Sequence, residues 1–492
     1  MNRFAQTTLW YTLVGLCGPL VALALTPLYT HAIGVAGYGT VDVLLSLWQG
    51  AYTVTLWGMA TVLAGIYTAT TDEVRRRSVV VSACTAVVLV ALLVGAVLYA
   101  LTPWIAHVIN RPDAVNAVPY LIASLPFAVV YTTVLTVFRL RNDIRRVVIA
   151  MIALVVITAL TRVMLVVVWR GGVVGMIQAA ALTNLIMAVL SVAVGWSFFG
   201  SRVDGTLMRT IYRTGVPLLP VSVTSWVLLY ADRWLLAPRV SQHALGQYAL
   251  AVLVASLLAF AIEPLKNAWQ PLALQPRFRD DDAFLALSYR LYLTTALLLM
   301  GLLVLATPLL LSIIGGTDAL PAAQYVLPLM SMPVLGGVQM VLGIRAVRDR
   351  RTQAFGLSSV TAALVNLGLN MLFIPRYGVL AAAWSTALAA LVATLVLALR
   401  EPGSTKAIVP HKGVGRVLLW VGLLSCWSVL GPSWWVGCGL LGITVWSVWH
   451  GWSALREFQH HTSGIEPEFD DSRVASEIVM HHNASGREYT EQ

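Results

Sequence analysis

The chain has 492 residues, of which 58% are hydrophobic and only 11% are charged, and its mean hydropathy is +0.80. A soluble globular protein with so few charged residues could not cover its surface, so the composition predicts an all-α polytopic membrane protein. The net charge of +10 lies mainly in short loops between apolar segments, which fits membrane lipids with anionic headgroups and argues against nucleic acid as a partner.

Fourteen apolar segments divide the chain, and each is long enough to cross about 30 Å of hydrocarbon. The first follows Arg3 and lacks a clear small-residue cleavage site, so we expect it to remain as a helix. The predicted membrane spans are 9–32, 40–70, 79–104, 115–138, 147–169, 173–199, 216–237, 246–271, 285–314, 325–347, 353–375, 378–399, 415–431 and 434–452.

Basic residues alternate strongly between successive gaps. Of the 32 Lys and Arg residues, 25 fall in gaps or ends on one side of the predicted membrane. The opposite side holds only Arg111, Arg170, Arg239 and Arg376. By the positive-inside rule, both termini are predicted to be cytoplasmic.

A weak internal repeat divides the apolar segments into two sets. Residues 34–38 recur loosely at 244–248, and 172–175 are echoed at 378–381, at offsets of 210 and 206 positions. Two similar offsets predict duplicated six-helix halves with the same orientation, related by an axis along the membrane normal. We therefore expect an N-lobe over 1–200, a C-lobe over 201–400, two further spans within 401–452, and a disordered cytoplasmic tail over 453–492. An irregular linker is predicted near 400–414.

Several charged residues lie inside the predicted spans, where charge is costly and therefore suggests function. The cations left unexplained by the loop pattern are Arg162, Arg233 and Lys266, and the acids are Asp232 and Glu263. Arg162 lies well inside its span and is expected to face a cavity. Arg233 could meet an anionic substrate or extend to the interface, and the two alternatives stay open.

Glu263, Lys266, Asn267 and Gln270 have the spacing i, i+3, i+4, i+7, which places them on one stripe of a helix. Such a stripe must face protein or water, and Pro264 is expected to kink the helix beside it. The alternative interpretation is an ion pair between Glu263 and Lys266 that only braces the helix.

The sequence also lacks the features of several enzyme classes. No GxxxxGK[ST] phosphate loop is present, and the outer gaps hold few carboxylates or histidines, so we expect no enzyme. We expect no metal site, because the paired histidines lie in a polar tail. No cofactor is expected beyond coupling to H⁺ or Na⁺, for which Asp42 is a further candidate.

Several short stretches together resemble a known family. They are YADRWLL at 230–236, ALGQY at 244–248, EPLKNAWQP at 263–271, TPLYT at 26–30, NLGLN at 366–370 and IPRYGV at 374–379. In order and spacing they are similar to the polysaccharide-biosynthesis flippases, the O-antigen and exopolysaccharide repeat-unit translocases of the multidrug/oligosaccharidyl-lipid/polysaccharide exporter superfamily. The resemblance covers about residues 1–400, with Glu263 standing where an apolar or small residue is more usual.

The resemblance implies two six-helix bundles in a V around a cationic cavity, followed by two more helices. It also implies that a polyprenyl-pyrophosphate-linked oligosaccharide is flipped from the cytoplasmic to the external leaflet of a bacterial or archaeal cytoplasmic (inner) membrane. The residues predicted to hold the pyrophosphate are Arg162, Arg233 and Lys266, together or in turn. Those predicted to contact sugar are Trp226, Tyr230, Trp269, Asn267 and Gln270. The candidates for ion coupling are Glu263, Asp232 and Asp42.

Three other functions remain open at the level of sequence. They are a flippase for peptidoglycan lipid precursors, a multidrug or cation antiporter of the same superfamily, and a scaffold without transport activity in a glycan-assembly complex. The expected partners are the lipid-linked oligosaccharide, membrane lipids, and glycan polymerase or assembly proteins. Three intramembrane cations against two acids disfavour the antiporter, which would need acidic groups for organic cations.

Overall fold

A computed structural model describes residues 3–109, 115–200, 202–278, 281–349, 351 and 353–408. All regular structure within these ranges is helical, in agreement with the predicted fold class. Among the described residues, ten helical segments are long and apolar enough to cross a membrane. Two of them, Leu20–Ala69 and Asp282–Leu342, have 50 and 61 residues, and each covers two predicted spans. Helices therefore match the first twelve predicted spans, whereas spans thirteen and fourteen and the tail lie outside the described residues.

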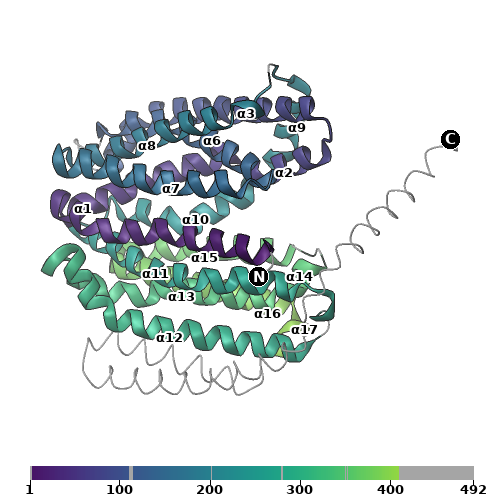
Figure 1. Cartoon of the computed structure of the whole chain (residues 1–492). Coiled ribbons are helices and arrows are strands. Elements are labelled where there is room, and N and C mark those ends of the chain that lie inside the picture. Colours follow the sequence, from purple (N-terminus) through teal and green to yellow (C-terminus); the bar gives the residue numbers. More distant parts are fainter. Residues whose placement is uncertain are drawn as a thin grey trace.

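The first half of the chain forms one lobe, drawn uppermost in Figure 1. Helix α6 packs against both α3 and α8, and α7 packs against α8. The elements of this half are α1 (Arg3–Leu56), α2 (Met59–Ala69), α3 (Glu73–Ala100), α4 (Thr102–Ile109), α6 (Val118–Leu140), α7 (Ile144–Arg162), η1 (Val163–Val168), α8 (Gly172–Val194) and η2 (Trp196–Phe198).

The second half forms the other lobe, in which α16 packs against α13 and α15. It is reached through α9 (Gly205–Gly215) and η3 (Val216–Leu218). Its elements are α10 (Leu219–Leu236), α11 (Gln242–Ala273), η4 (Pro276–Phe278), α12 (Asp282–Gly315), η5 (Gly316–Ala322), α13 (Ala323–Leu342), α14 (Ile344–Arg348), α15 (Gln353–Tyr377), α16 (Val379–Arg400) and α17 (Pro402–Ile408). The lobes meet where α1 packs on α10, α11 and α12 (Figure 1).

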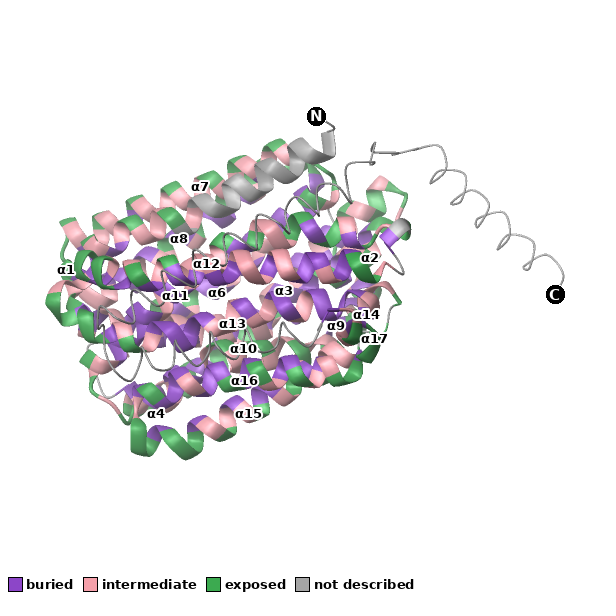
Figure 2. Cartoon of the chain, turned by 90° about the horizontal axis from the view of Figure 1, so that it is seen from below, coloured by how far each residue is buried: buried purple, intermediate pink, exposed green. Residues whose placement is uncertain are grey.

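Large apolar side chains lie on the outside of the bundle. Leu364 is 66% exposed and Leu399 is 80% exposed, and Figure 2 shows buried residues along the middle of the bundle with exposed ones on outer helices such as α7 and α15. Small side chains dominate the buried face of α16, including Ala382, Ala383 and Ala389. Small residues inside and apolar residues outside are the pattern of helices that pack within lipid.

Glycines with positive φ set the main breaks and turns. At Gly34 φ is 73° and ψ is 162°, and this one residue separates the first two predicted spans within α1. The gap of residues 33–39 between the first two predicted spans is therefore too long. A single glycine can adopt the positive φ that breaks the helix, so no loop is needed. Gly172 and Gly378, in the two halves of the repeat, also have positive φ, of 61° and 56°, at the tight turns before α8 and α16.

The second span contains a break that the hydropathy pattern does not predict. Trp57 and Gly58 have φ values of 27° and 79° and separate α1 from α2. Trp57 stacks on Tyr212 of α9 with ring centroids 5.4 Å apart. A Cβ atom on Gly215 would lie 2.2 Å from the Trp57 ring, so the break is held against the connection between the lobes.

Polar caps hold helix ends near the loops that are rich in arginine. Asp204 accepts hydrogen bonds from the side chain and the backbone of Thr206 at the start of α9, and these bonds lower the pKa of Asp204. The Glu73 carboxylate accepts a hydrogen bond from Arg141 at 2.5 Å and raises the pKa of that guanidinium. The linker predicted to be irregular near 400–414 is helical over Pro402–Ile408, because proline is favoured at the first helical position.

Candidate functional site

The two ends of the bundle differ in charge. We call the end with Arg170, Arg239 and Arg376 the Arg-poor end, and the end with Arg75, Arg141 and the other basic loops the Arg-rich end. In Figure 1 the Arg-rich end lies on the right, near α9 and α14.

The lobes are in backbone contact near the Arg-poor end. A Cβ atom on Gly39 would lie 2.4 Å from the backbone nitrogen of Gly246, and one on Gly246 would lie 1.9 Å from the carbonyl oxygen of Val35. Thr40 donates to Gln242 Oε1 at 3.1 Å, and Gln242 Nε2 donates to the carbonyl of Ile109 at 2.9 Å. Only glycines permit α1 and α11 to approach this closely, so the described structure is closed at the Arg-poor end.

Arg233 lies beside this closure and bridges the lobes. Its Nε donates to Asp42 Oδ2 of α1 at 2.7 Å. Its Nη1 donates to Asp232 Oδ1 at 2.9 Å and to the carbonyl of Leu229 at 2.7 Å. Tyr248 of α11 donates to the other oxygen of Asp232. Arg233 is only 3% exposed, so in this conformation its charge serves the interface rather than a ligand.

Aromatic residues predicted to contact sugar lie in the same inter-lobe contact. Trp226 donates from Nε1 to the carbonyl of Ser46 at 2.9 Å, and its ring lies over Gly50, where a Cβ atom would be 2.7 Å away. Tyr230 lies with its ring centroid 5.2 Å from the guanidinium carbon of Arg233. Trp234, which the sequence did not single out, donates from Nε1 to Ser46 Oγ at 3.0 Å.

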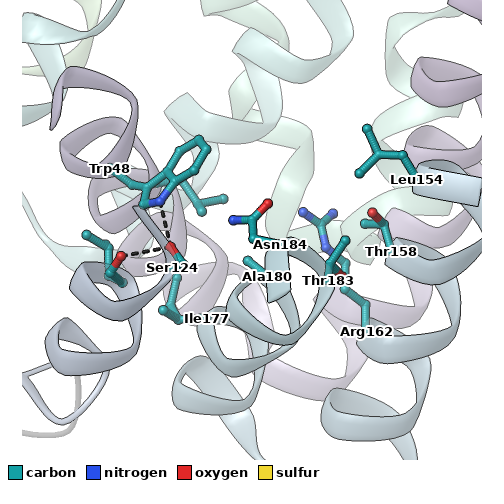
Figure 3. Close-up of a pocket in the computed structure, with 11 residues that line it drawn as sticks. Trp48, Ser124, Leu154, Thr158, Arg162, Ile177, Ala180, Thr183 and Asn184 are labelled. Atoms are coloured by element: carbon teal, nitrogen blue, oxygen red, sulfur yellow. Dashed lines mark hydrogen bonds between the residues drawn. The ribbon is translucent and has the colours of Figure 1, made fainter. Parts of the chain in front are cut away.

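Arg162 lies in a cavity of about 160 Å³ within the first lobe (Figure 3). Figure 3 shows its guanidinium directed between Thr158 of α7 and Asn184 of α8. The α-helix α7 ends at Arg162 and continues as the π-helical turn η1, a local geometry often found at functional sites. The other lining residues are Leu45, Trp48, Leu121, Ser124, Leu154, Ile177, Ala180 and Thr183.

Two buried polar atoms at and beside Arg162 lack hydrogen-bond partners. Its Nε is buried without a hydrogen bond, and so is the hydroxyl of Tyr29, whose ring centroid lies 6.0 Å from the guanidinium carbon. Arg162 has no ion pair with any described residue, and its electrostatic neighbours are the tyrosines Tyr29 and Tyr38. Buried polar atoms are normally satisfied, whereas Nε of Arg162 is not, and the lining of this cavity contains no acid to balance the guanidinium charge.

The predicted stripe on α11 lines a second cavity, of about 430 Å³, in the second lobe. Lys266 donates to Glu263 at 2.8 Å, so the two charges are paired in this conformation. The helix α11 continues through Pro264 to Ala273. The lining comprises Glu263, Lys266, Asn267 and Gln270 of α11, Gly336, Gln339 and Met340 of α13, Ile344 and Val347 of α14, and Phe355 of α15.

Trp269 does not line this cavity, although it lines a smaller neighbouring one together with Lys266. It is 9% exposed and stacks on Phe284 of α12 with ring centroids 6.4 Å apart. The three predicted cations are therefore separated: Arg162 in the first lobe, Arg233 at the interface, and Lys266 in the second lobe. The expectation that they act together on one ligand does not describe this conformation, because packing gives two of them carboxylate partners.

Sequence reasoning gave no role to Tyr29 or Thr158, because aromatic and hydroxyl residues are common in membrane helices. The buried amides Asn366 and Asn370 of α15 are linked to α16: Asn370 donates to Asn366 at 3.0 Å, and Asn366 donates to Thr386 of α16 at 3.3 Å.

Comparisons with known proteins place the chain in a family. The family described as "Polysaccharide biosynthesis protein" matches residues 4–274. The solved structure of the lipid II flippase MurJ in an inward closed conformation is similar with a TM-score of 0.68 at 12% identity, covering 92% of this chain and 99% of that chain. An inward-facing MATE transporter of the MOP superfamily gives 0.59 at 14% identity, covering 80% and 95%.

A mutant of the Vibrio cholerae MATE transporter VcmN gives a TM-score of 0.53 at 14% identity, covering 82% of this chain and 97% of that chain. No curated protein sequence matches. The structural likenesses establish the fold, and the family match covers more than half of the chain, which confirms the predicted resemblance. This multi-pass membrane protein belongs to the polysaccharide biosynthesis protein family and shares the fold of the MurJ and MATE transporters.

Proposed function

We propose that the protein flips a polyprenyl-pyrophosphate-linked oligosaccharide from the cytoplasmic to the external leaflet by alternating access between its two lobes. Moving a pyrophosphate through hydrocarbon is prohibitive unless protein groups replace its hydration. The family match, with its description of polysaccharide biosynthesis, and the fold shared with the lipid II flippase MurJ support this substrate class.

The observation that carries the proposal is the unpaired guanidinium of Arg162. Its Nε is buried without a partner, and the nearby Tyr29, whose ring centroid lies 6.0 Å from the guanidinium carbon, also has a buried hydroxyl without a partner. A guanidinium binds phosphate oxygens through two parallel hydrogen bonds, and phosphate supplies the anionic acceptor that the lining of this cavity lacks. Arg233 and Lys266 already have carboxylate partners, so we assign the pyrophosphate to Arg162.

Arg233 has a different role in this proposal. With the Arg-rich end in the cytoplasm, as the charge distribution predicts, the closure at Gly39 and Gly246 faces outside. Opening the outer end then requires Asp42 and Arg233 to separate. Asp42 and Asp232 place two carboxylates against one guanidinium, and binding of H⁺ or Na⁺ at this excess negative charge would weaken their hold on Arg233 and couple an ion gradient to opening.

The other functions differ in what they require of the cavities. An antiporter for organic cations needs an acid free to meet its substrate, whereas the cavity of Arg162 presents a free cation. A flippase for peptidoglycan precursors uses the same pyrophosphate chemistry and differs only in the glycan. A scaffold needs neither an unpaired cation nor a lobe contact that can open.

Reconstituted vesicles test the function directly. The probe is a polyprenyl-pyrophosphate carrying an N-acetylhexosamine disaccharide with a fluorophore on the glycan, and added dithionite destroys only fluorophore on the outer leaflet. We expect the protein, under an imposed H⁺ or Na⁺ gradient, to expose inner-leaflet probe to dithionite. If no vesicle condition accelerates exposure over protein-free vesicles, the proposed function is wrong.

Variants in the same assay test the site. A charge-assisted hydrogen bond contributes about 1.5–3 kcal/mol, so Arg162→Gln should slow flipping about 10- to 100-fold, and Arg162→Lys should retain part of the rate. Arg239→Gln is the matched control, because Arg239 is exposed at the Arg-poor end and bonds only to the carbonyl of Leu235 among the described residues. Normal flipping by Arg162→Gln would remove Arg162 from the site.

A further inference from the structure

The cavity in the second lobe is lined by helices that correspond, in the repeat, to three of the four that line the Arg162 cavity, but it lies toward the opposite end of the bundle. The Arg162 cavity is lined by the second, fourth, fifth and sixth helices of its lobe, namely α1 after Gly34, α6, α7 and α8. The other is lined by the second, fourth and fifth, namely α11, α13 with α14, and α15. The first lies toward the Arg-poor end, whereas the second lies toward the Arg-rich end, where α14 begins.

The two cavities differ in charge. In the second, the ammonium of Lys266 lies 2.8 Å from the carboxylate of Glu263, and the pair is formally neutral. Glu263 keeps 52% of its side chain exposed, whereas Lys266 keeps 27%. An anion entering this cavity would meet a cation that is already paired and a carboxylate that repels it. An uncharged ligand is therefore favoured.

Amide groups supply the remaining polar surface. The side chains of Asn267 and Gln270 form no hydrogen bond with described residues, although both line the cavity. The side chain of Gln339 is anchored to α16, because its Nε2 donates to Thr394 Oγ1 at 3.1 Å. Its Oε1 has no partner among the described residues. Amides offer both donors and acceptors, which is what a run of sugar hydroxyls requires.

Apolar groups complete the lining. Phe355 and Met340 face the same space as the amides, and the C–H faces of a pyranose ring pack on such surfaces. The volume of about 430 Å³ lies within the range of about 300–1,000 Å³ typical of small-molecule sites. A neutral pair, three amide groups and an apolar wall together match an uncharged saccharide.

We infer that this cavity binds uncharged sugar residues of the transported lipid, with Gln339 as a specificity-determining residue and Glu263 as the group that rejects acidic sugars. The inference rests on the proposed function, because the pyrophosphate is then held at Arg162. The glycan would extend from that deep anion site toward the Arg-rich end, where the bulky polar head enters.

Binding to protein in nanodiscs tests the inference with three synthetic probes. They are polyprenyl-pyrophosphate without sugar, the same lipid with an N-acetylhexosamine disaccharide, and the same lipid with a hexuronic acid as its terminal sugar. A neutral hydrogen bond contributes about 0.5–1.5 kcal/mol, so Asn267→Leu and Gln339→Met should each weaken binding of the uncharged glycolipid about 2- to 10-fold. Both should leave affinity for the sugar-free lipid unchanged.

Two controls separate site effects from folding. Gln324→Met changes an exposed glutamine on the same helix α13 that lies outside the cavity, and it should bind all probes as the unchanged protein does. Glu263→Gln should raise affinity for the acidic glycolipid, because it removes the repelling carboxylate and frees Lys266. A gain in binding cannot come from misfolding.

The outcomes distinguish this inference from the function on which it rests. If no probe binds the unchanged protein, the proposed function fails. If Arg162→Gln weakens binding of all three lipids, but the cavity variants alter neither the uncharged nor the acidic glycolipid, the function stands and the glycan cavity is rejected. Equal loss of the sugar-free lipid in Gln339→Met would also reject it.

Discussion

Arg233 of α10 and Asp42 of α1 form an ion pair of 2.7 Å that joins the two lobes across 191 positions of sequence. Both residues lie in predicted spans, and the pair lies beside the glycine contact at the Arg-poor end. The charges that the loop pattern left unexplained thus include one that closes the molecule, and this closure can be tested separately from substrate binding.

Removing the Asp42 charge should favour opening. The Asp42 side chain is 26% exposed, so solvent partly screens its attraction to Arg233. We therefore expect Asp42→Asn to destabilise the closed arrangement by about 1–2 kcal/mol. This corresponds to a shift of about tenfold toward the open form. A cysteine at position 40 (Thr40→Cys), in a protein whose native cysteines have been replaced, reports opening. Thr40 is 0% exposed in the closed arrangement, so the cysteine can react only when the lobes separate. The rate of modification by an impermeant maleimide should rise about tenfold.

Asp318→Asn is the matched control for this experiment, because Asp318 is an acidic residue at the same end that takes no part in the ion pair between the lobes. It should leave the maleimide rate unchanged. Equal rates in Asp42→Asn and the unchanged protein would show that the ion pair does not hold the lobes together.

Locking the lobes together should stop transport. Thr40 and Gln242 touch across the interface at 3.1 Å, so Thr40→Cys with Gln242→Cys should be joined by a short bifunctional thiol reagent. We expect flipping in vesicles to stop on cross-linking and to return when a reducible linker is cleaved. Each single cysteine variant treated with the same reagent serves as control. Undiminished flipping by the cross-linked protein would contradict alternating access at this end.

Gly246 should be intolerant of even one methyl group. Its Cβ atom would lie 1.9 Å from the carbonyl of Val35, so Gly246→Ala cannot form the observed closure. We expect Thr40→Cys to become reactive to maleimide in this background and flipping to fall. The control is Gly368→Ala on α15, where a Cβ atom meets nothing within 4 Å. A closed and active Gly246→Ala protein would show that the contact is dispensable.

Removing the hydroxyl of Tyr29 is expected to have opposite effects on stability and on transport. It is buried without a partner, so Tyr29→Phe should not lower the thermal unfolding temperature and should stabilise the protein by up to about 1 kcal/mol. If this hydroxyl serves the pyrophosphate beside Arg162, flipping should nevertheless slow several-fold. Unchanged flipping together with raised stability would exclude Tyr29 from the site, and Tyr377→Phe at an exposed position is the control.

The sequence predicted the helices well, because the length and hydropathy of a membrane span are local properties. The stripe of Glu263, Lys266, Asn267 and Gln270 was also predictable, since helical spacing alone places it on one face. The break at Trp57 and Gly58 was not, because both residues lie within an uninterrupted apolar run and the break depends on packing against Gly215.

The roles of the three cations could not be predicted from local sequence patterns. Lys266 has its partner three positions away, which spacing can suggest, whereas Asp42 reaches Arg233 only after the lobes assemble. The isolation of Arg162 is a property of four helices that bring no acid near it. The sequence alone showed that placing these charges in a membrane costs free energy. The packing of the lobes showed which cations are paired with a carboxylate and which one is not.

The contact between Gly39 and Gly246 also bears on the energetics of the cycle. Glycines have no side-chain torsions, so their meeting freezes no rotamers and their separation releases none. The close approach gains dispersion energy over a small area only. A contact built in this way keeps the closed and open lobe arrangements near in free energy. The proposed alternating-access cycle requires this, because the protein would populate both arrangements in every turnover.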